Sequence, residues 1–153
     1  MFFDFAPRCP VNEHHTPSPE SFSAIERLLV ERPNLRTFCR VEVEETERFY
    51  VVQVPAPVKD HGDLWVSTAD SEFTVSFDKW HSHHDFEEVA EVVALVDGIM
   101  EERLVVTVKT LDGKWSGSTI HPRAESPHAS FESWQGEAYT RSWRGTYDAP
   151  PPA

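Results

Sequence analysis

Cysteine is scarce in this chain, and this scarcity limits the kind of fold that the chain can adopt. The 153 residues include two cysteines, Cys9 and Cys39. Two are too few for a disulfide scaffold, and their spacing does not match a zinc knuckle. A domain of about 150 residues buries roughly 70% of its unfolded surface, so a core can form without such staples. We expect a single domain over residues 1–153 with reduced thiols, as in a cytosolic protein.

Long apolar runs are also missing. No stretch approaches the roughly 18 apolar residues that suggest a membrane-spanning helix. Residues 1–5 lack the basic region and the long apolar run of a signal peptide. These absences predict a protein that does not enter a membrane and that resides in the cytoplasm.

Basic residues are outnumbered by acidic ones. The chain has 14 Lys and Arg against 26 Asp and Glu, which gives a net charge of −12. Because nucleic-acid binding relies on Lys and Arg at the phosphates, this balance excludes a nucleic-acid partner and disfavours an anionic membrane. The same charge would attract a basic protein and speed the encounter. The alternative is that the acidic surface serves solubility alone, since net charge specifies no partner.

Catalytic signatures are missing as well. The chain contains no Gly-x-Ser-x-Gly elbow and no phosphate-binding loop. Cys39 occupies a strand-like position, and nothing near it in sequence marks it as an activated nucleophile. Paired carboxylates such as Glu87-Glu88 are typical of solvated faces and identify no acid–base pair. We therefore favour a protein that is not an enzyme.

The residues that are present predict an α+β fold, with a mainly antiparallel sheet and two helices packed on it. The first helix begins with the capping Ser18 and with Pro19, and it ends before Pro33. The second begins at Asp85, with Glu88 three residues later as in a capping box. Its apolar residues recur at helical spacing and give it a strong apolar face.

Strands are expected between and after these helices. Apolar patterning predicts strands over residues 40–44, 49–52, 64–66, 73–77, 104–111 and 114–120, and one further strand or hairpin within 134–147. Asp112-Gly113 is a two-residue hairpin signal. Prolines make residues 1–18 an irregular arm and residues 148–153 a Pro-rich tail.

Residues 80–86 hold the clearest candidate for a site. This segment contains three of the eight histidines of the chain, namely His81, His83 and His84. Neutral imidazole is the commonest metal ligand. On an extended segment His81 and His83 project to one face and His84 to the other. A metal site would use His81, His83 and a third ligand such as Asp85, and zinc would be the cofactor. His61, His121 or a glutamate are alternative third ligands.

The other interpretation of these histidines is a structural corner that holds no cofactor. His81 and His83 continue the parity of residues 73–77, whose aromatic and valine side chains we expect to face the core. Lys79 interrupts this parity, so a bend, or departure of the strand from the sheet, is expected there. A histidine at a core edge can donate from one ring nitrogen and accept at the other, and Asp85 would be used as the helix cap.

A row of glutamates and two tryptophans form the candidate partner-binding surface. Its residues are Glu42, Glu44, Glu45, Glu47, Trp115 and Trp143. Strand alternation places Glu42 and Glu44 on one face. This stripe suits a basic protein surface, or it protects a sheet edge. Each tryptophan lies beside a basic residue and close to a glycine. Tryptophan often anchors interfaces, although packing on a helix is the alternative.

One stretch of the chain resembles a known class of proteins. Phe77-Asp78-Lys79-Trp80-His81-Ser82-His83-His84-Asp85-Phe86 is similar to a segment of small bacterial proteins of the polymorphic-toxin immunity type, in which an aromatic residue and a His-x-His precede an acidic-capped helix. Residues 101–105 and 113–118 continue the resemblance, which covers about a third of the chain. The resemblance implies a stoichiometric inhibitor that binds a cognate toxin, often a basic nuclease, and occludes its active site.

The sequence therefore leaves three functions open. The first is a non-enzymatic acidic binding protein, such as an immunity protein that neutralises a basic toxin. The second is a metal-dependent enzyme or metal-binding protein that uses the cluster of His81, His83 and His84. The third is a structural or accessory domain whose surface carries no chemistry.

Overall fold

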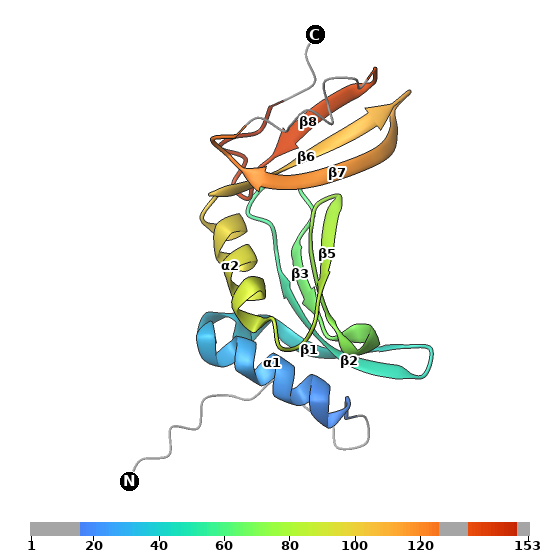
Figure 1. Ribbon diagram of the computed structural model, residues 1–153, viewed down its shortest axis with the longest axis vertical. Coiled ribbons are helices and arrows are strands. Elements are labelled where there is room, and N and C mark those ends of the chain that lie inside the picture. Colours follow the sequence, from blue (N-terminus) through green and yellow to red (C-terminus); the bar gives the residue numbers. More distant parts are fainter. Residues whose placement is uncertain (1–15, 126–134, 150–153) are drawn as a thin grey trace. The chain divides into compact units, whose positions relative to one another are not determined.

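The structure, a computed structural model, describes residues 16–125 and 135–149 (Figure 1). These residues form two α-helices, two short 3-10 helices and eight strands in two antiparallel sheets, which confirms the α+β fold class. The division of the strands between two sheets was not expected. Residues 1–15 of the expected arm, Trp134, and residues 150–153 of the expected tail lie outside the described residues.

The larger sheet has five strands whose spatial order follows their order in the chain. They are β1 (Cys39–Glu44), β2 (Glu47–Val54), β3 (Leu64–Ser67), β4 (Phe73–Phe77) and β5 (Trp80–His84). β1 and β2 pair antiparallel around a two-residue turn, with Cys39 opposite Val52 and Glu44 opposite Glu47. Because the order is sequential, β1 and β5 are the two edges of the sheet.

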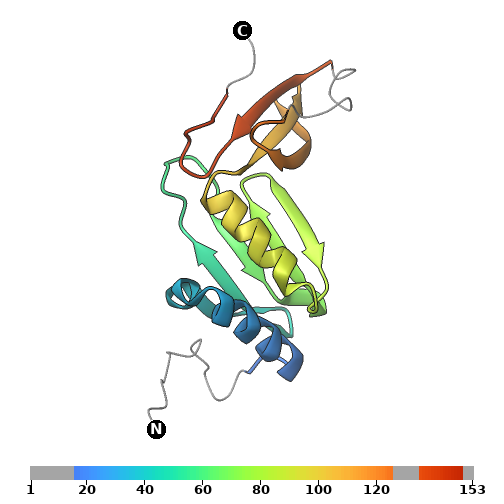
Figure 2. The same ribbon diagram turned by 60° about the vertical axis from the view of Figure 1, so that its left-hand side comes forward.

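Helix α1 (Pro19–Glu31) packs on β2 (Figure 2). As expected, Ser18 is the N-cap, and its side chain accepts a hydrogen bond from the backbone N of Ser21 at 3.2 Å. The rings of Phe22 and Tyr50 meet at a centroid distance of 6.2 Å. A 3-10 helix, η1 (Pro33–Phe38), then leads from α1 into β1.

A tight turn at Asp78-Lys79 separates β4 from β5, so the strand does not run on into the histidines. Asp78 adopts a left-handed backbone conformation with φ 54°. Beyond this turn Trp80 is buried, whereas His81 and His83 are exposed. The expectation that His81 and His83 continue the core-facing parity of residues 73–77 is wrong, because the turn resets the alternation.

Helix α2 (Val89–Met100) begins four residues after Asp85. Asp85 instead opens a turn in which its backbone carbonyl accepts from the backbone N of Glu88 at 2.9 Å. The expected apolar face is present, since Val92, Val96 and Ile99 are fully or almost fully buried. In the described parts of the chain, no helix combines the length and the apolarity needed to cross a bilayer.

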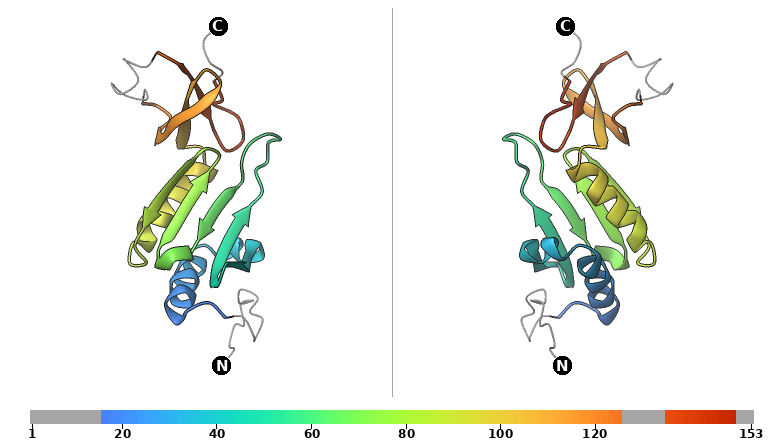
Figure 3. Two further views of the ribbon diagram at one scale, coloured as in Figure 1. Left: turned by 90° about the vertical axis from the view of Figure 1, so that its right-hand side faces the viewer. Right: turned by 90° about the vertical axis from the view of Figure 1, so that its left-hand side faces the viewer.

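The smaller sheet has the order β7-β6-β8 and is antiparallel throughout (Figure 3, orange to red). Its strands are β6 (Leu104–Leu111), β7 (Lys114–Pro122) and β8 (Glu137–Arg141). The predicted Asp112-Gly113 hairpin joins β6 to β7, with both residues at positive φ, 52° and 75°. β8 is the further strand that was expected within residues 134–147.

The described chain divides into two compact units that interleave along the sequence. Unit 1 consists of the described residues within Met1–Val54, Trp65–Val75 and Ser82–Val93; unit 2 consists of those within Pro55–Leu64, Ser76–His81 and Ala94–Ala153. The expectation of a single domain over residues 1–153 stays a prediction.

Cys39, the first residue of β1, is buried and disulfide-bonded. The expectation of a reduced thiol at this position is therefore wrong. The sequence did not predict a disulfide at Cys39, because two cysteines make no recognisable disulfide framework. Cys9 lies outside the described residues. Disulfides are rare in the reducing cytosol, and the cytoplasmic location stays a prediction.

Candidate functional site

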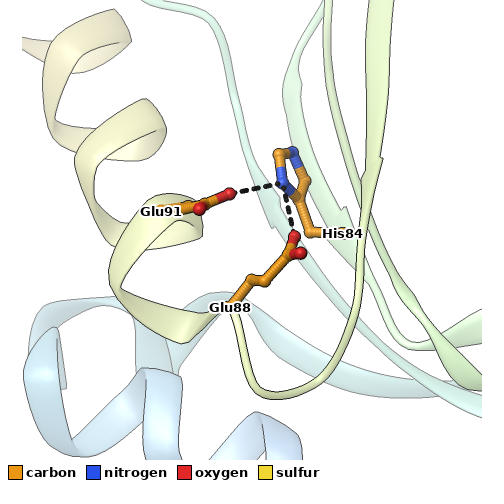
Figure 4. Close-up of side chains that lie close together, drawn as sticks. All are labelled: His84, Glu88 and Glu91. Atoms are coloured by element: carbon orange, nitrogen blue, oxygen red, sulfur yellow. Dashed lines mark ion pairs between the residues drawn. The ribbon is translucent and has the colours of Figure 1, made fainter.

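Three potential metal ligands converge in unit 1, where β5 is followed by α2 (Figure 4). His84 Nδ1 lies 3.4 Å from Glu88 Oε2 and 3.6 Å from Glu91 Oε2. The ligand atoms of all three side chains lie within 4.8 Å of one another. The His84 side chain is 13% exposed and that of Glu91 is 66% exposed, so the cluster opens to solvent on the helix side.

Local structure explains why these three side chains meet. Alternation along β5 gives His84 the same side as Trp80 and Ser82, opposite to the exposed histidines. Glu88 and Glu91 are three residues apart at the start of α2, a spacing that places two side chains on one helix face. Ser82 Oγ lies 2.7 Å from His84 Nε2, which fixes the ring and leaves Nδ1 directed at the two carboxylates.

The predicted metal ligands His81, His83 and Asp85 do not converge within the described residues. All three are exposed. The ring of His83 is engaged elsewhere, with Nδ1 2.7 Å from Glu72 Oε1 and 3.1 Å from Thr74 Oγ1. The signal that could have found the converging set is a histidine followed by glutamates four and seven positions later.

The two histidines considered as alternative third ligands instead contact polar groups within unit 2. His61 Nε2 lies 2.7 Å from Asp148 Oδ2, and the His61 side chain is buried. His121 is also buried, with Nε2 2.8 Å from Thr107 Oγ1 and Nδ1 2.9 Å from the carbonyl oxygen of Pro122. Both rings therefore hold the loops and strands around them.

The predicted glutamate row lies on the hairpin formed by β1 and β2. We term this set the anionic hairpin: Glu42, Glu44, Glu45 and Glu47. Glu44 and Glu45 are exposed, and Glu42 and Glu47 are half-buried. Glu44 and Glu47 are direct cross-strand partners, and Glu45 occupies the turn with a left-handed φ of 54°.

Two of these glutamates are engaged within unit 1. Arg40 Nε donates to Glu42 Oε1 at 2.7 Å, and the same guanidinium lies 5.3 Å from the centre of the Trp65 ring. Glu47 Oε1 accepts from the backbone N of Asp70 at 2.6 Å. Glu44 and Glu45 therefore form the most outward part of the anionic hairpin.

The two predicted tryptophan anchors differ in accessibility. Trp115, on β7, is 57% exposed, whereas Trp143 is only 5% exposed. The Trp143 ring packs against Phe77 at a centroid distance of 5.7 Å. Trp143 therefore belongs to the core of unit 2. Trp115 remains accessible, but it too belongs to unit 2, whereas the anionic hairpin belongs to unit 1.

A buried carboxylate, Glu102, organises the loop that contains Trp143. Its Oε1 accepts from the backbone N of Arg144 at 2.6 Å and from that of Thr146 at 3.4 Å. Burial by itself raises the pKa of Glu102, but hydrogen bonds from Thr146, Arg144 and Ser142 together outweigh burial and lower the pKa. Trp143 and Arg144 therefore stand together in the sequence because they form a loop that Glu102 holds in place.

An open groove of unit 1 lies between α1 and the first turns of α2. It has a volume of about 760 Å³, and its lining includes Phe22, Val30, Val89 and Val93. Val30 is among the most exposed large apolar side chains of the described residues. The apolar lining distinguishes this groove from the anionic hairpin.

Comparison with known proteins returned no match: no family model, no curated protein and no solved structure corresponds to this chain.

Proposed function

We propose that this protein is a non-enzymatic acidic binding protein whose anionic hairpin docks on a basic protein, in the manner of an immunity protein that neutralises a bacterial toxin. The proposal combines the excess of acidic residues, the exposure of Glu44 and Glu45, and the resemblance of residues 77–86 to immunity-type proteins.

The observation that carries the proposal is the pairing of Glu44 with Glu47 across the hairpin. Like charges directly opposite one another destabilise a sheet. The turn between them adds a second unfavourable choice, because Glu45 takes a left-handed conformation that favours Gly, Asn or Asp. Local rules are broken mainly where function requires it. A cationic surface would relieve the repulsion that the free hairpin carries.

The position of the anionic hairpin suits docking. β1 is an edge strand, so no other strand of the described residues pairs with the backbone groups on its outer side. The net charge of −12 would steer a basic partner toward the protein. Edge protection is the competing explanation for Glu42 and Glu44. In edge protection, the glutamates repel the strands of other protein molecules, and no cationic partner is predicted. The two explanations therefore differ in whether a basic protein binds.

The test is protection of a host cell. The full chain is co-expressed with a candidate basic toxin, such as the product of any toxin-like reading frame adjacent to its own gene, and growth is measured. Wild-type protein is expected to restore growth, and the Glu44→Lys/Glu45→Lys variant is expected to protect less. A matched variant, Glu101→Lys/Glu125→Lys, makes the same change in net charge at exposed positions elsewhere and should protect fully. Equal protection by both variants would remove the anionic hairpin from the mechanism.

A further inference from the structure

We infer that His84, Glu88 and Glu91 form a zinc site with an exchangeable fourth ligand. This inference is independent of the anionic hairpin, because none of the three residues belongs to it.

The distances within the cluster suit a shared cation better than direct hydrogen bonds. N–H···O hydrogen bonds have donor–acceptor distances of about 2.7–3.2 Å, whereas His84 Nδ1 is 3.4 Å from Glu88 Oε2 and 3.6 Å from Glu91 Oε2. Tetrahedral ligands at zinc–nitrogen and zinc–oxygen distances of about 2.0–2.2 Å lie about 3.3–3.6 Å apart. The two measured separations are close to the edges of such a tetrahedron.

The histidine is oriented as a metal ligand requires. Metal-binding histidines generally hydrogen-bond through the ring nitrogen that does not face the metal, and this contact fixes the ring. In this protein Ser82 Oγ occupies that place, 2.7 Å from His84 Nε2. The serine and the histidine point the same way because they are two residues apart on β5.

The donor set indicates the metal and the kind of site. One imidazole and two carboxylates suit zinc, and three protein ligands leave a fourth position open, as in catalytic zinc sites. The two carboxylates balance the double charge of the ion. Glu91 is 66% exposed, so the fourth position is within reach of water or of a small anionic ligand.

The experiment is zinc titration calorimetry on the full chain, purified without an affinity tag. We expect one zinc site per chain that depends on His84. Glu91→Gln should weaken zinc binding at least tenfold, and because Glu91 is exposed this variant should keep the fold. Ser82→Ala should weaken binding about tenfold through loss of ring orientation. The matched controls His83→Ala and Glu87→Gln alter exposed neighbours outside the cluster and should bind zinc as the wild type does.

A second readout identifies the coordinating atom. In nitrogen NMR spectra of the imidazole groups, zinc should shift His84 Nδ1 and leave His84 Nε2 hydrogen-bonded. Absence of binding at micromolar zinc would overturn the inference and leave His84 beside two glutamates with no shared ion. Binding that survives in both His84→Ala and Glu91→Gln would overturn it as well, since the zinc would then lie elsewhere.

Discussion

Replacing Glu102 by glutamine should destabilise the protein and change its response to acid. The carboxylate is 4% exposed and accepts backbone hydrogen bonds from Arg144 and Thr146. Hydrogen bonds to a charged group contribute about 1.5–3 kcal/mol each, roughly twice as much as neutral ones. Because the amide oxygen of glutamine can still accept, we expect a loss of about 1–2 kcal/mol at pH 7.

The direction of the pH effect follows from the lowered pKa of Glu102. A carboxyl whose pKa is lower in the folded state stabilises the fold above the unfolded value, which is near 4.5, and this contribution disappears as the pH falls through the folded value. The difference between wild type and Glu102→Gln should therefore shrink in acid. Urea unfolding between pH 7 and pH 3 measures it.

The neighbouring glutamate provides the matched control for this prediction. Glu101 is 61% exposed and contacts only the exposed Arg103 among the ion pairs of the described segments, at 2.8 Å. Glu101→Gln should leave the stability almost unchanged. A loss in Glu102→Gln no larger than in Glu101→Gln, or a loss that stays constant down to pH 3, would refute the role of the buried carboxylate.

Four further substitutions test other parts of the structure. Glu44→Lys should raise the free energy of unfolding by about 0.5 kcal/mol, because it turns a repulsive cross-strand pair into an attractive one. Glu45→Lys lies in the turn and should raise the free energy of unfolding less. Equal increases in stability, measured by thermal unfolding, would contradict the register. Tyr50→Phe should cost nothing at pH 7, since the buried hydroxyl has no hydrogen-bond partner among the described residues. Burial raises the pKa of Tyr50, so wild-type stability should fall above about pH 10 and that of the variant should fall less. Gly98→Ala should lower the free energy of unfolding by about 1 kcal/mol, although alanine favours a helix more than glycine does. The reason is that the new Cβ would lie 2.6 Å from Leu104 Cδ1. A higher free energy of unfolding in urea would show that the leucine moves aside.

Much of the fold followed from local patterns in the sequence. Ser18-Pro19 defined the start of α1, and Asp112-Gly113 defined the hairpin of the smaller sheet, because each depends on the conformational preference of one or two residues. The sequence indicated a bend at Lys79, where the parity is interrupted, but it did not predict the tight turn at Asp78-Lys79. This turn lacks glycine, and an aspartate at positive φ next to a lysine gives a weak turn signal.

That turn accounts for the difference between the predicted metal ligands and the side chains that converge in the structure. Without it, His81 and His83 continued the parity of the preceding strand, and Asp85 became a helix cap. With it, His84 is the inward histidine, and the helix begins late enough for Glu88 and Glu91 to approach it. Side-chain direction along a strand inverts with a shift of one residue, so His84, and not His81 or His83, lies on the side that faces the two glutamates.

Packing between distant segments was the other part that the sequence did not predict. Trp143 reads as a surface anchor beside Arg144 and Gly145, yet it is buried against Phe77, 66 positions earlier. No local pattern reports such a contact. The anionic hairpin was predicted because strand alternation and a turn of acidic residues are local features.

The proposed function implies a basic toxin as the partner, and the measurement that tests this function most directly is the association rate constant with such a toxin, determined at several salt concentrations. The account predicts that the wild type associates fast and that its rate constant depends strongly on salt. For Glu44→Lys/Glu45→Lys, the rate constant at low salt should be about tenfold lower and should depend less on salt. The charge-matched Glu101→Lys/Glu125→Lys variant should associate almost as fast as wild type. If the two variants associate at the same rate, or if wild-type association does not depend on salt, the anionic hairpin is not the docking surface.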